Sequence, residues 1–269
     1  MSAPPVSASP GSEPGSPPPA LTLTAVPGLP LIQPGDDLPR LLLDAIRSSG
    51  QALRTGDILV LAQKIVSKAE NRLVHLPDLP VSPRAAGLAD ETGKDPHLVQ
   101  AILDESREVL RSRPGLIVVE HRLGFVCANA GIDHSNVRGS DDWVLLLPED
   151  PDRSAAGIRA ALETATGARI GVLIIDSHGR AWRNGTVGVV IGLSGLPGLV
   201  DKRGEADLFG RELVATVIGA ADELAAGASL VMGQAGEGTP VVHVRGFPYP
   251  LGEGSLPEIL RSKESDLFR

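Results

Sequence analysis

The chain has 269 residues, a length that predicts one large domain or two small ones packed closely together. Asp and Glu outnumber Lys and Arg by 33 to 25, giving a net charge of −8, and aromatic residues are only 3% of the chain, so nucleic-acid binding by a basic field or by stacking is excluded. The single cysteine, Cys127, excludes a disulfide framework and a cysteine-cluster metal site, and we expect it to be a small core residue.

The two ends of the chain differ in composition from its middle. Residues 1–20 are nearly all Pro, Ser, Ala and Gly, which predicts a disordered tail. Without a secretory signal pattern or a run of about 18 apolar residues, a cytoplasmic location without membrane association is expected. We expect a single domain over 21–249 and a short C-terminal tail over 250–269.

Helical and strand patterns interleave along the chain from Leu21 onward. Strands are predicted over 21–26, 58–62, 115–120, 124–128, 169–175, 187–193 and 241–245, and helices over 38–48, 96–111, 154–167 and 211–226. The run at 58–62 is apolar throughout, which is typical of a strand buried on both faces. This order predicts an α+β or mixed α/β fold.

Four polar clusters follow apolar strands, where ligand sites of sheet proteins gather. In the first, over 63–70, Lys64 and Lys68 are four residues apart and would share a helix face. Like charges at that spacing repel unless an anion lies between them, so the pair favours a phosphate, although a solvated helix face explains it equally well.

The second cluster, over 129–136, offers the hard oxygen ligands that Mg²⁺ and Mn²⁺ prefer, from Asp133, Ser135 and Asn136. An ordinary Asx turn is the alternative interpretation.

The third cluster, over 176–185, begins with Asp176 at a strand end, a common position for a metal ligand. Arg180 and Arg183 supply planar groups that bind phosphate or carboxylate. Trp182 is expected to pack, and His178 is interpreted as a surface or hydrogen-bonded residue rather than a general base.

The fourth cluster, over 231–240, has three glycines within six residues and resembles a loop whose backbone N–H groups bind phosphate. It is not a Walker motif, because no Lys-Ser or Lys-Thr follows, and a plain hairpin loop is the alternative. Together the clusters suggest metal-assisted phosphate chemistry.

Taken in order, several segments resemble the coenzyme F420-0 gamma-glutamyl ligase family, over about residues 21 to 247. They are GDILVLAQKIVSKAENR, GFVCANAGIDHSNV, LLPEDPDRSA, IDSHGRAWRNG, and ADELAAGASLVMGQA followed by VVHVRG. The resemblance implies an intertwined mixed α/β homodimer that is neither a P-loop nor an ATP-grasp protein. It also implies use of GTP and two divalent ions, Mn²⁺ or Mg²⁺, with a monovalent cation such as K⁺ as an optional addition. The implied reaction joins L-glutamate, once or repeatedly, to the carboxylate of F420-0 through an acyl phosphate.

The resemblance also implies roles for single residues. Asp133 and Asp176 would hold the first metal, and Ser177 and Gln234 would reach the second. The implied GTP contacts are Leu29, Pro30, Leu31, Ile32, Gln63, Lys68, Asn136, Met232, Gly233 and Gly236. Arg180 and Arg183 are candidate phosphate or substrate contacts, and no general base is assigned.

Two positions depart from the family's pattern. Gly188 stands where Asp is common, and His178 where an aromatic residue is frequent, so the second-metal environment or the tail length is expected to differ. Two alternatives follow: a ligase of the same fold that acts on a different acid, and a nucleotide-binding protein without turnover.

Overall fold

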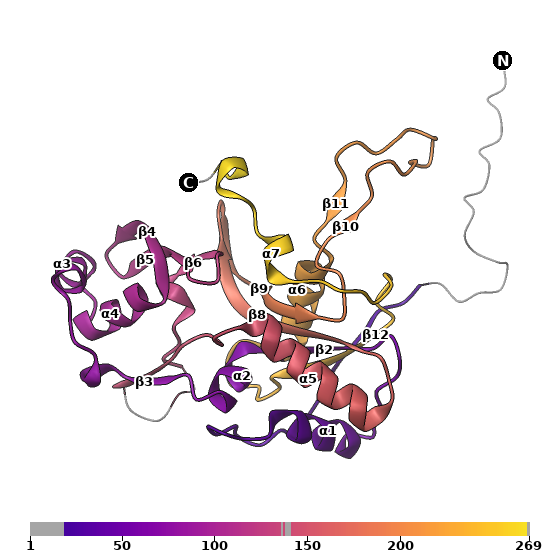
Figure 1. Ribbon diagram of the computed structural model, residues 1–269, viewed down its shortest axis with the longest axis horizontal. Helices are drawn as coiled ribbons and strands as arrows, with labels where there is room; N and C mark the ends of the chain where they lie inside the picture. Colours follow the sequence, from indigo (N-terminus) through magenta and orange to yellow (C-terminus); the bar gives the residue numbers. More distant parts are fainter. Residues whose placement is uncertain (1–18, 136, 138–140, 268–269) are drawn as a thin grey trace.

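The computed structural model describes residues 19–135, 137 and 141–267 of the chain. These residues form a mixed α+β fold with several sheets, as the interleaved pattern predicts (Figure 1). The central sheet has five strands, in the spatial order β1 (Thr22–Ala25), β12 (Val241–Arg245), β2 (Ile58–Ala62), β8 (Gly171–Arg180) and β9 (Arg183–Ser194). The strands predicted over 21–26, 58–62 and 241–245 are therefore confirmed.

The pairing of β2 with β8 brings two of the predicted clusters together. These strands run parallel, with Ala62 opposite Ile175, so their carboxyl ends meet at one edge of the sheet. Gln63 and Asp176 follow at that edge. On the other side of β2 the strand β12 is antiparallel, and the backbone N–H of Ala62 donates to the carbonyl of Pro240 at 2.9 Å. The glycine-rich cluster therefore reaches the same edge.

Helices cover both faces of the central sheet (Figure 1). Residues of β2 alternate between two cores, which explains why this strand is apolar throughout. One core contains residues of α1 (Leu38–Ser48), α2 (Gln63–Ala69) and α5 (Pro151–Thr166), and the other contains α6 (Ala220–Met232). The bounds of α1 agree with the prediction, because Asp37 caps its first turn by accepting from the backbone N–H of Arg40 at 3.2 Å.

A smaller core lies beside the central sheet. It is formed by the three-stranded sheet of β4 (Ser106–Arg113), β5 (Leu116–His121) and β6 (Val126–Ala128) together with α3 (Pro83–Thr92) and α4 (Pro96–Asp104). Cys127 is buried there, as predicted. The remaining short elements are η1 (Leu76–Asp78), η2 (Asn129–Gly131) and the pair β3 (Leu73–His75) and β7 (Trp143–Leu145).

The helix predicted over 96–111 is wrong beyond Asp104. Residues 106–113 form β4, which pairs with β5 through a turn in which Gly115 has a φ of 81°. The pattern of this segment fits a helix locally, but the Pro114-Gly115 turn and the apolar strand that follows favour a hairpin. Tertiary pairing has overridden local propensity here.

A buried ionic network surrounds Glu105, directly after α4. Its carboxylate binds Arg72 and Arg122, each at 2.8 Å, and His121 Nε2 lies 3.5 Å from it. The two arginines also donate to the carbonyls of Leu147 and Glu149, at 2.8 and 2.7 Å. The network therefore ties the small sheet to the segment between β7 and α5.

Replacing Glu105 by glutamine is expected to lower the free energy of unfolding at pH 7 by about 3 kcal/mol. Burial by itself would raise the pKa of Glu105, but His121, Arg122 and Arg72 outweigh it and hold the pKa at about 2. A folded-state pKa below the unfolded one gives stability that is present at neutral pH and is lost as pH falls from about 5 to 2.

Urea unfolding at pH 7 and at pH 3 measures this effect of Glu105. The free energy of unfolding of Glu105→Gln should fall less between pH 7 and pH 3 than that of wild type. Glu253→Gln changes a carboxylate side chain that is 85% exposed and should leave the free energy of unfolding unchanged at both pH values. Equal pH dependence in wild type and Glu105→Gln would contradict the assignment.

The third cluster is not a loop. The strands β8 and β9 extend beyond the predicted ends at Ile175 and Val187 and form one long hairpin, with Arg180 opposite Arg183. Ala181 and Trp182 make the turn, and Trp182 has a φ of 64°. Hairpin turns of this kind normally carry Gly or Asn, so the sequence gives no turn signal at this point.

The helix predicted over 211–226 is wrong at its start and at its end, since α6 spans Ala220–Met232. The preceding residues belong to an arm, residues 199–218, that contains the paired strands β10 (Val200–Asp201) and β11 (Val217–Ile218). The β-branched residues Thr216, Val217 and Ile218 favour a strand, and the helix begins only after Gly219. The arm and the β8–β9 hairpin project on the same side of the molecule (Figure 1).

Residues beyond 250 lie along the central sheet. They include α7 (Leu256–Ile259) and η3 (Lys263–Ser265), and the buried Leu256 donates its backbone N–H to Asp152 at 2.8 Å. Within the described residues, no helix is both long enough and apolar enough to cross a membrane.

Candidate functional site

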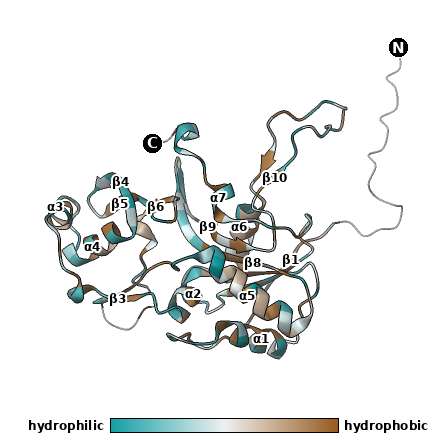
Figure 2. Cartoon of the chain, viewed as in Figure 1, coloured by the Kyte–Doolittle hydropathy of each residue, from teal (hydrophilic) through white to brown (hydrophobic). Residues whose placement is uncertain are grey.

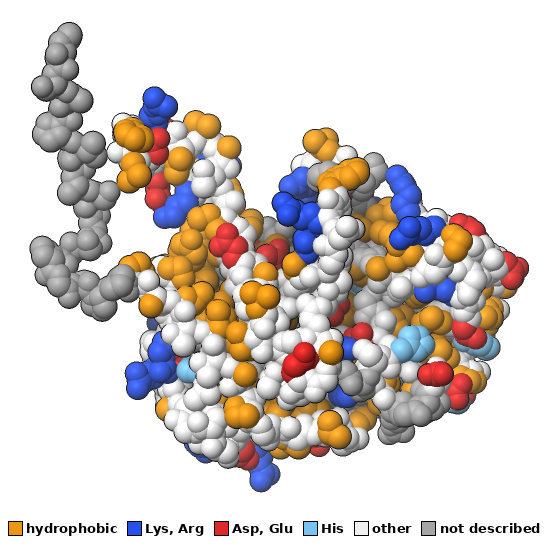
Figure 3. All heavy atoms as spheres, turned by 180° about the vertical axis from the view of Figure 1, so that it is seen from behind, with side chains coloured by type: hydrophobic (Ala, Val, Ile, Leu, Met, Phe, Trp, Pro, Cys, Tyr) orange, Lys and Arg blue, Asp and Glu red, His pale blue; other side chains and the backbone are white. Residues whose placement is uncertain are grey.

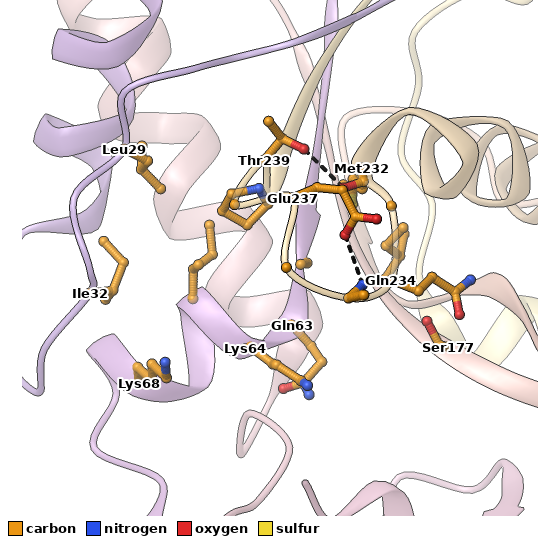
Figure 4. Close-up of a pocket in the computed structure, with 18 of the residues that line it drawn as sticks. Leu29, Ile32, Gln63, Lys64, Lys68, Ser177, Met232, Gln234, Glu237 and Thr239 are labelled. Carbon is orange, nitrogen blue, oxygen red and sulfur yellow. Dashed lines mark hydrogen bonds between the residues drawn. The ribbon is translucent and has the colours of Figure 1, made fainter. Parts of the chain in front are cut away.

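A cavity of about 550 Å³ lies at the sheet edge where β2 ends beside Ile175 of β8. It is lined by residues 29–32, by the start of α2, by Ile175 to Ser177 of β8, and by residues 232–240. In Figure 4, Leu29 and Ile32 lie on one side of the cavity, and Gln234 and Ser177 lie on the other. With Val137, segments from five parts of the sequence thus form one pocket.

The helix α2 brings three polar side chains to this pocket because it begins directly after β2. Gln63 is buried, accepts from the hydroxyl of Ser67 at 2.8 Å and donates to Asp133 Oδ2 at 2.6 Å. Lys64 and Lys68 both line the cavity. Burial, and secondarily the charge of Lys64, lowers the pKa of the Lys68 amine.

Asp133 is fixed by its backbone and by both carboxylate oxygens. Its N–H and carbonyl pair with Leu145 at 3.0 and 2.9 Å, and Lys64 Nζ lies 3.2 Å from Oδ1. Burial raises the pKa of Asp133 to about 6, and the nearby charge of Asp176 adds to the increase. A largely desolvated carboxylate with a second carboxylate nearby is a suitable environment for a cation.

Asp176 and Ser177 line the cavity from the part of β8 that continues past the sheet edge. A shift of register between Ile174 and Ile175 precedes them, and such bulges re-aim the side chains that follow. His178 Nε2 lies 3.1 Å from Asp176 Oδ2. This contact agrees with the prediction that His178 is a hydrogen-bonded residue.

The glycine-rich loop follows α6 and forms the wall of the cavity next to β12. Gly233 has a φ of 71°, and a Cβ atom there would lie 2.2 Å from Glu237, so the position requires glycine. Gln234 accepts from the hydroxyl of Thr186 at 2.8 Å and donates to Ser229 at 3.1 Å. These bonds tie the loop to β9 and α6.

Sequence reasoning missed Glu237 as a pocket residue. Its carboxylate accepts from the backbone N–H of Ala235 at 2.8 Å, and backbone hydrogen bonds of this kind lower the pKa of Glu237 (Figure 4). The available signal was an acidic residue between two glycines of the loop, at Gly236 and Gly238.

The structure brings together most of the predicted site residues. The cavity is lined by Leu29, Pro30, Leu31, Ile32, Gln63, Lys68, Asp176, Ser177, Met232, Gly233, Gln234 and Gly236. Asp133 joins them through Gln63 and Lys64. Asn136 lies outside the described residues.

Arg180 and Arg183 do not line this cavity. They stand opposite each other near the tip of the β8–β9 hairpin, on either side of the turn. Trp182 in that turn is 88% exposed, so the expectation that it packs is wrong within this chain. The hairpin has carried these side chains beyond the sheet edge because β8 does not end at Asp176.

The donors in the pocket fit a hard divalent cation. Two carboxylates, a hydroxyl and an amide, from Asp133, Asp176, Ser177 and Gln234, are oxygen ligands of the kind that Mg²⁺ and Mn²⁺ take. Among the described residues no group of three or more His, Cys, Asp or Glu side chains could hold a metal. Asp133 and Asp176 with neutral oxygen donors are the set that we assign to the cation, and Glu237 adds a further carboxylate to the cavity wall.

The fold and the pocket define a protein in which a glycine-rich loop, a helix bearing lysines and two carboxylates share one cavity. The chain belongs to the F420-0:gamma-glutamyl ligase family, whose sequence model matches residues 28–246. It is 49% identical over 251 residues to the coenzyme F420:L-glutamate ligase of Methanothermobacter thermautotrophicus, covering 93% of this chain and 99% of that protein.

Two further relatives carry the same name. That of Methanopyrus kandleri is 46% identical, over 93% of this chain and 98% of that protein. That of Archaeoglobus fulgidus is 47% identical, over 91% of this chain and 94% of that protein.

Proposed function

We propose that this protein is a ligase of coenzyme F420 biosynthesis that joins L-glutamate to F420-0 with GTP and divalent metal ions, Mn²⁺ or Mg²⁺. The observation that carries the proposal is the single cavity in which the loop at Gly233, the amine of Lys68 and the carboxylate of Asp176 meet. The names of the relatives, which match nearly the whole chain, support the same reaction.

The proposed role of each residue follows from its position in the cavity. Lys68 and the backbone N–H groups of the glycine loop bind the phosphates, while the segment 29–32 contacts the rest of the nucleotide. Asp133, Asp176, Ser177 and Gln234 would hold the divalent ions, which supply charge neutralisation for phosphoryl transfer. Gln63 orients Asp133 through its 2.6 Å hydrogen bond.

The proposed chemistry has two steps. The γ-phosphoryl group of GTP breaks its bond to the β-phosphate oxygen and bonds to a carboxylate oxygen of F420-0, giving GDP and an acyl phosphate. The amine of glutamate then attacks the acyl carbon, an amide forms, and inorganic phosphate leaves. The amine proton passes to phosphate or to water.

The position of the glycine loop supports a phosphate site unlike that of the P-loop proteins. In a P-loop the glycines lie between a strand and the N-terminus of a helix. Here the loop follows the C-terminus of α6 and leads into β12. Oriented backbone N–H groups, rather than a helix dipole, would therefore bind the anion.

The assay that tests the proposed function uses the full chain with Mn²⁺, GTP, glutamate and F420-0. We expect GDP release that depends on all four components and a product heavier by one or more glutamyl units. GDP release with a different acid in place of F420-0 would indicate another substrate. GTP binding without turnover would overturn the assignment of a ligase.

We also propose a homodimer in which the arm contacts a second copy. The arm exposes large apolar side chains, with Leu208 at 78%, Phe209 at 80% and Val214 at 82%. Exposed apolar surface on a projecting element is typical of an interface. Figure 2 shows hydrophobic stretches along the arm, and Figure 3 shows hydrophobic side chains gathered on it, away from the body.

Replacing Phe209 and Val214 by aspartate is expected to weaken association of the two copies at least about a hundredfold. Two apolar side chains that become buried when the dimer forms contribute about 3 kcal/mol or more to its stability. Sedimentation over a range of concentrations measures the change. Leu230→Asp, at an exposed position on α6, is the matched control and should leave the mass unchanged. Dimers that persist in the double variant would exclude the arm as the interface.

A further inference from the structure

Lys64 forms an ion pair with the partly buried carboxylate of Asp133, which we assign to metal binding. Its Nζ lies 3.2 Å from Asp133 Oδ1 and donates to Ser135 Oγ at 2.7 Å. Lys64 lies beside Gln63 in Figure 4. Gln63 contacts Oδ2 of Asp133 and Lys64 lies next to Oδ1, so both carboxylate oxygens have a partner. An oxygen that a divalent ion would use is occupied by an ammonium group.

The surroundings of Lys64 carry charges of both signs. Lys68 lies one turn further along α2, and it also lines the cavity. Asp176 and Glu237 face the same cavity. Lys64 therefore has a carboxylate partner in Asp133 and a second cationic side chain, Lys68, on the same helix.

We propose that Lys64 is a displaceable counter-cation. Before ligands bind, its ammonium neutralises Asp133, and when a divalent ion binds that carboxylate, the ammonium moves to the phosphates of the nucleotide. The inference rests on the proposed function and adds to it a residue that links metal binding with nucleotide binding.

The physical reason is that two cations compete for one oxygen. A divalent ion and an ammonium within about 4 Å of each other repel by several kcal/mol unless an anion lies between them. The side chain of Lys64 is long and 28% exposed, so it has the freedom to leave Asp133. Triphosphate supplies the anion that would hold both Lys64 and Lys68, whose charges otherwise repel.

This arrangement predicts effects of opposite sign. Without Lys64 the divalent ion no longer competes, so Lys64→Met should bind Mn²⁺ alone about tenfold more tightly. The same variant lacks one phosphate contact, so it should bind GTP in the presence of Mn²⁺ about tenfold more weakly. A lysine with a purely structural role would not produce this combination.

The experiment measures Mn²⁺ binding to the full chain by electron paramagnetic resonance, and then GTP binding at saturating Mn²⁺ by calorimetry. Lys68→Met is the matched variant: it should weaken GTP binding but change Mn²⁺ affinity less than Lys64→Met does, because the ammonium of Lys64 lies 3.2 Å from Asp133 Oδ1 and competes directly for that oxygen. Lys64→Arg, which keeps the charge, should bind Mn²⁺ as wild type does. Circular dichroism establishes that each variant is folded.

The outcomes separate this inference from the proposed function. Mn²⁺ affinity that is unchanged or weaker in folded Lys64→Met, while wild type binds both Mn²⁺ and GTP, overturns the role of Lys64 alone. Wild type that binds neither overturns the proposed function as well. Tighter Mn²⁺ binding together with weaker GTP binding supports the displaceable counter-cation.

Discussion

Replacing Asp133 by asparagine is expected to lower the rate of glutamate ligation at least about a thousandfold, while the protein remains folded. The change removes the negative charge from the carboxylate that Gln63 and Lys64 position at 2.6 and 3.2 Å. A divalent ion would lose a charged ligand, and the phosphates would lose the neutralisation that it supplies, which is worth several kcal/mol in phosphoryl transfer.

The stability of Asp133→Asn should equal or exceed that of wild type. Burial raises the pKa of Asp133 to about 6, which means that the fold disfavours the ionised form. The backbone pairing of residue 133 with Leu145 does not depend on the side chain. Asparagine has the same size and no charge to desolvate, so the melting temperature should not fall.

Initial rates of GDP release and thermal melting of the same preparations measure both effects. Asp44→Asn, at a carboxylate on the outer face of α1 that is 59% exposed, should retain the wild-type rate. A rate for Asp133→Asn within tenfold of wild type would exclude Asp133 from the reaction. A large fall in melting temperature would instead assign it a structural role.

The parts of the fold that the sequence predicts well are those in which local signals agree with tertiary packing. The helix at Leu38–Ser48 has a capping Asp37 and apolar residues at helical spacing, and the strand at Ile58–Ala62 has a continuous apolar run. The failures occur where the pairing of strands decides: β4, the β8–β9 hairpin and the arm all depend on partner strands that helical or strand periodicity does not reveal.

The site was predictable to a similar extent. Four separate clusters were expected because polar residues followed apolar strands, and the parallel pairing of Ala62 with Ile175 explains why two of them meet. The contact of Lys64 with Asp133 was not predictable, since the two residues are 69 positions apart. Arg180 and Arg183 were misplaced because the strand β8 continues past Asp176 instead of ending there.

The acidic net charge of the chain is compatible with anionic ligands once the site is considered locally. A net charge of −8 describes the whole sequence, whereas the cavity contains Lys64 and Lys68 as well as Asp176. Carboxylates can hold divalent ions, and the positive charge of those ions would attract the triphosphate. The acidity that excludes nucleic-acid binding therefore does not exclude a nucleotide.

Replacing Gly188 by aspartate, the residue that the family resemblance leads us to expect at this position, should lower the free energy of unfolding by about 4 kcal/mol or more. Gly188 lies on β9 opposite Ser177, and α6 packs directly against it. A Cβ atom there would lie 2.6 Å from the carbonyl oxygen of Ala225 and 2.7 Å from the Cβ of Ser229. Overpacking costs about 1–3 kcal/mol, and a buried carboxylate without a partner adds more.

Urea unfolding of Gly188→Ala and Gly188→Asp separates the two contributions. Alanine should cost about 2 kcal/mol through overpacking alone, and aspartate should cost more because of its charge. Gly179→Asp is the matched control, since a Cβ at Gly179 on the neighbouring strand has nothing within 4 Å, and its stability should change by less than about 0.5 kcal/mol. Wild-type stability in Gly188→Asp would mean that α6 does not pack on β9 as described. A large loss would mean that the close packing of α6 against β9 beside Ser177 requires glycine at position 188.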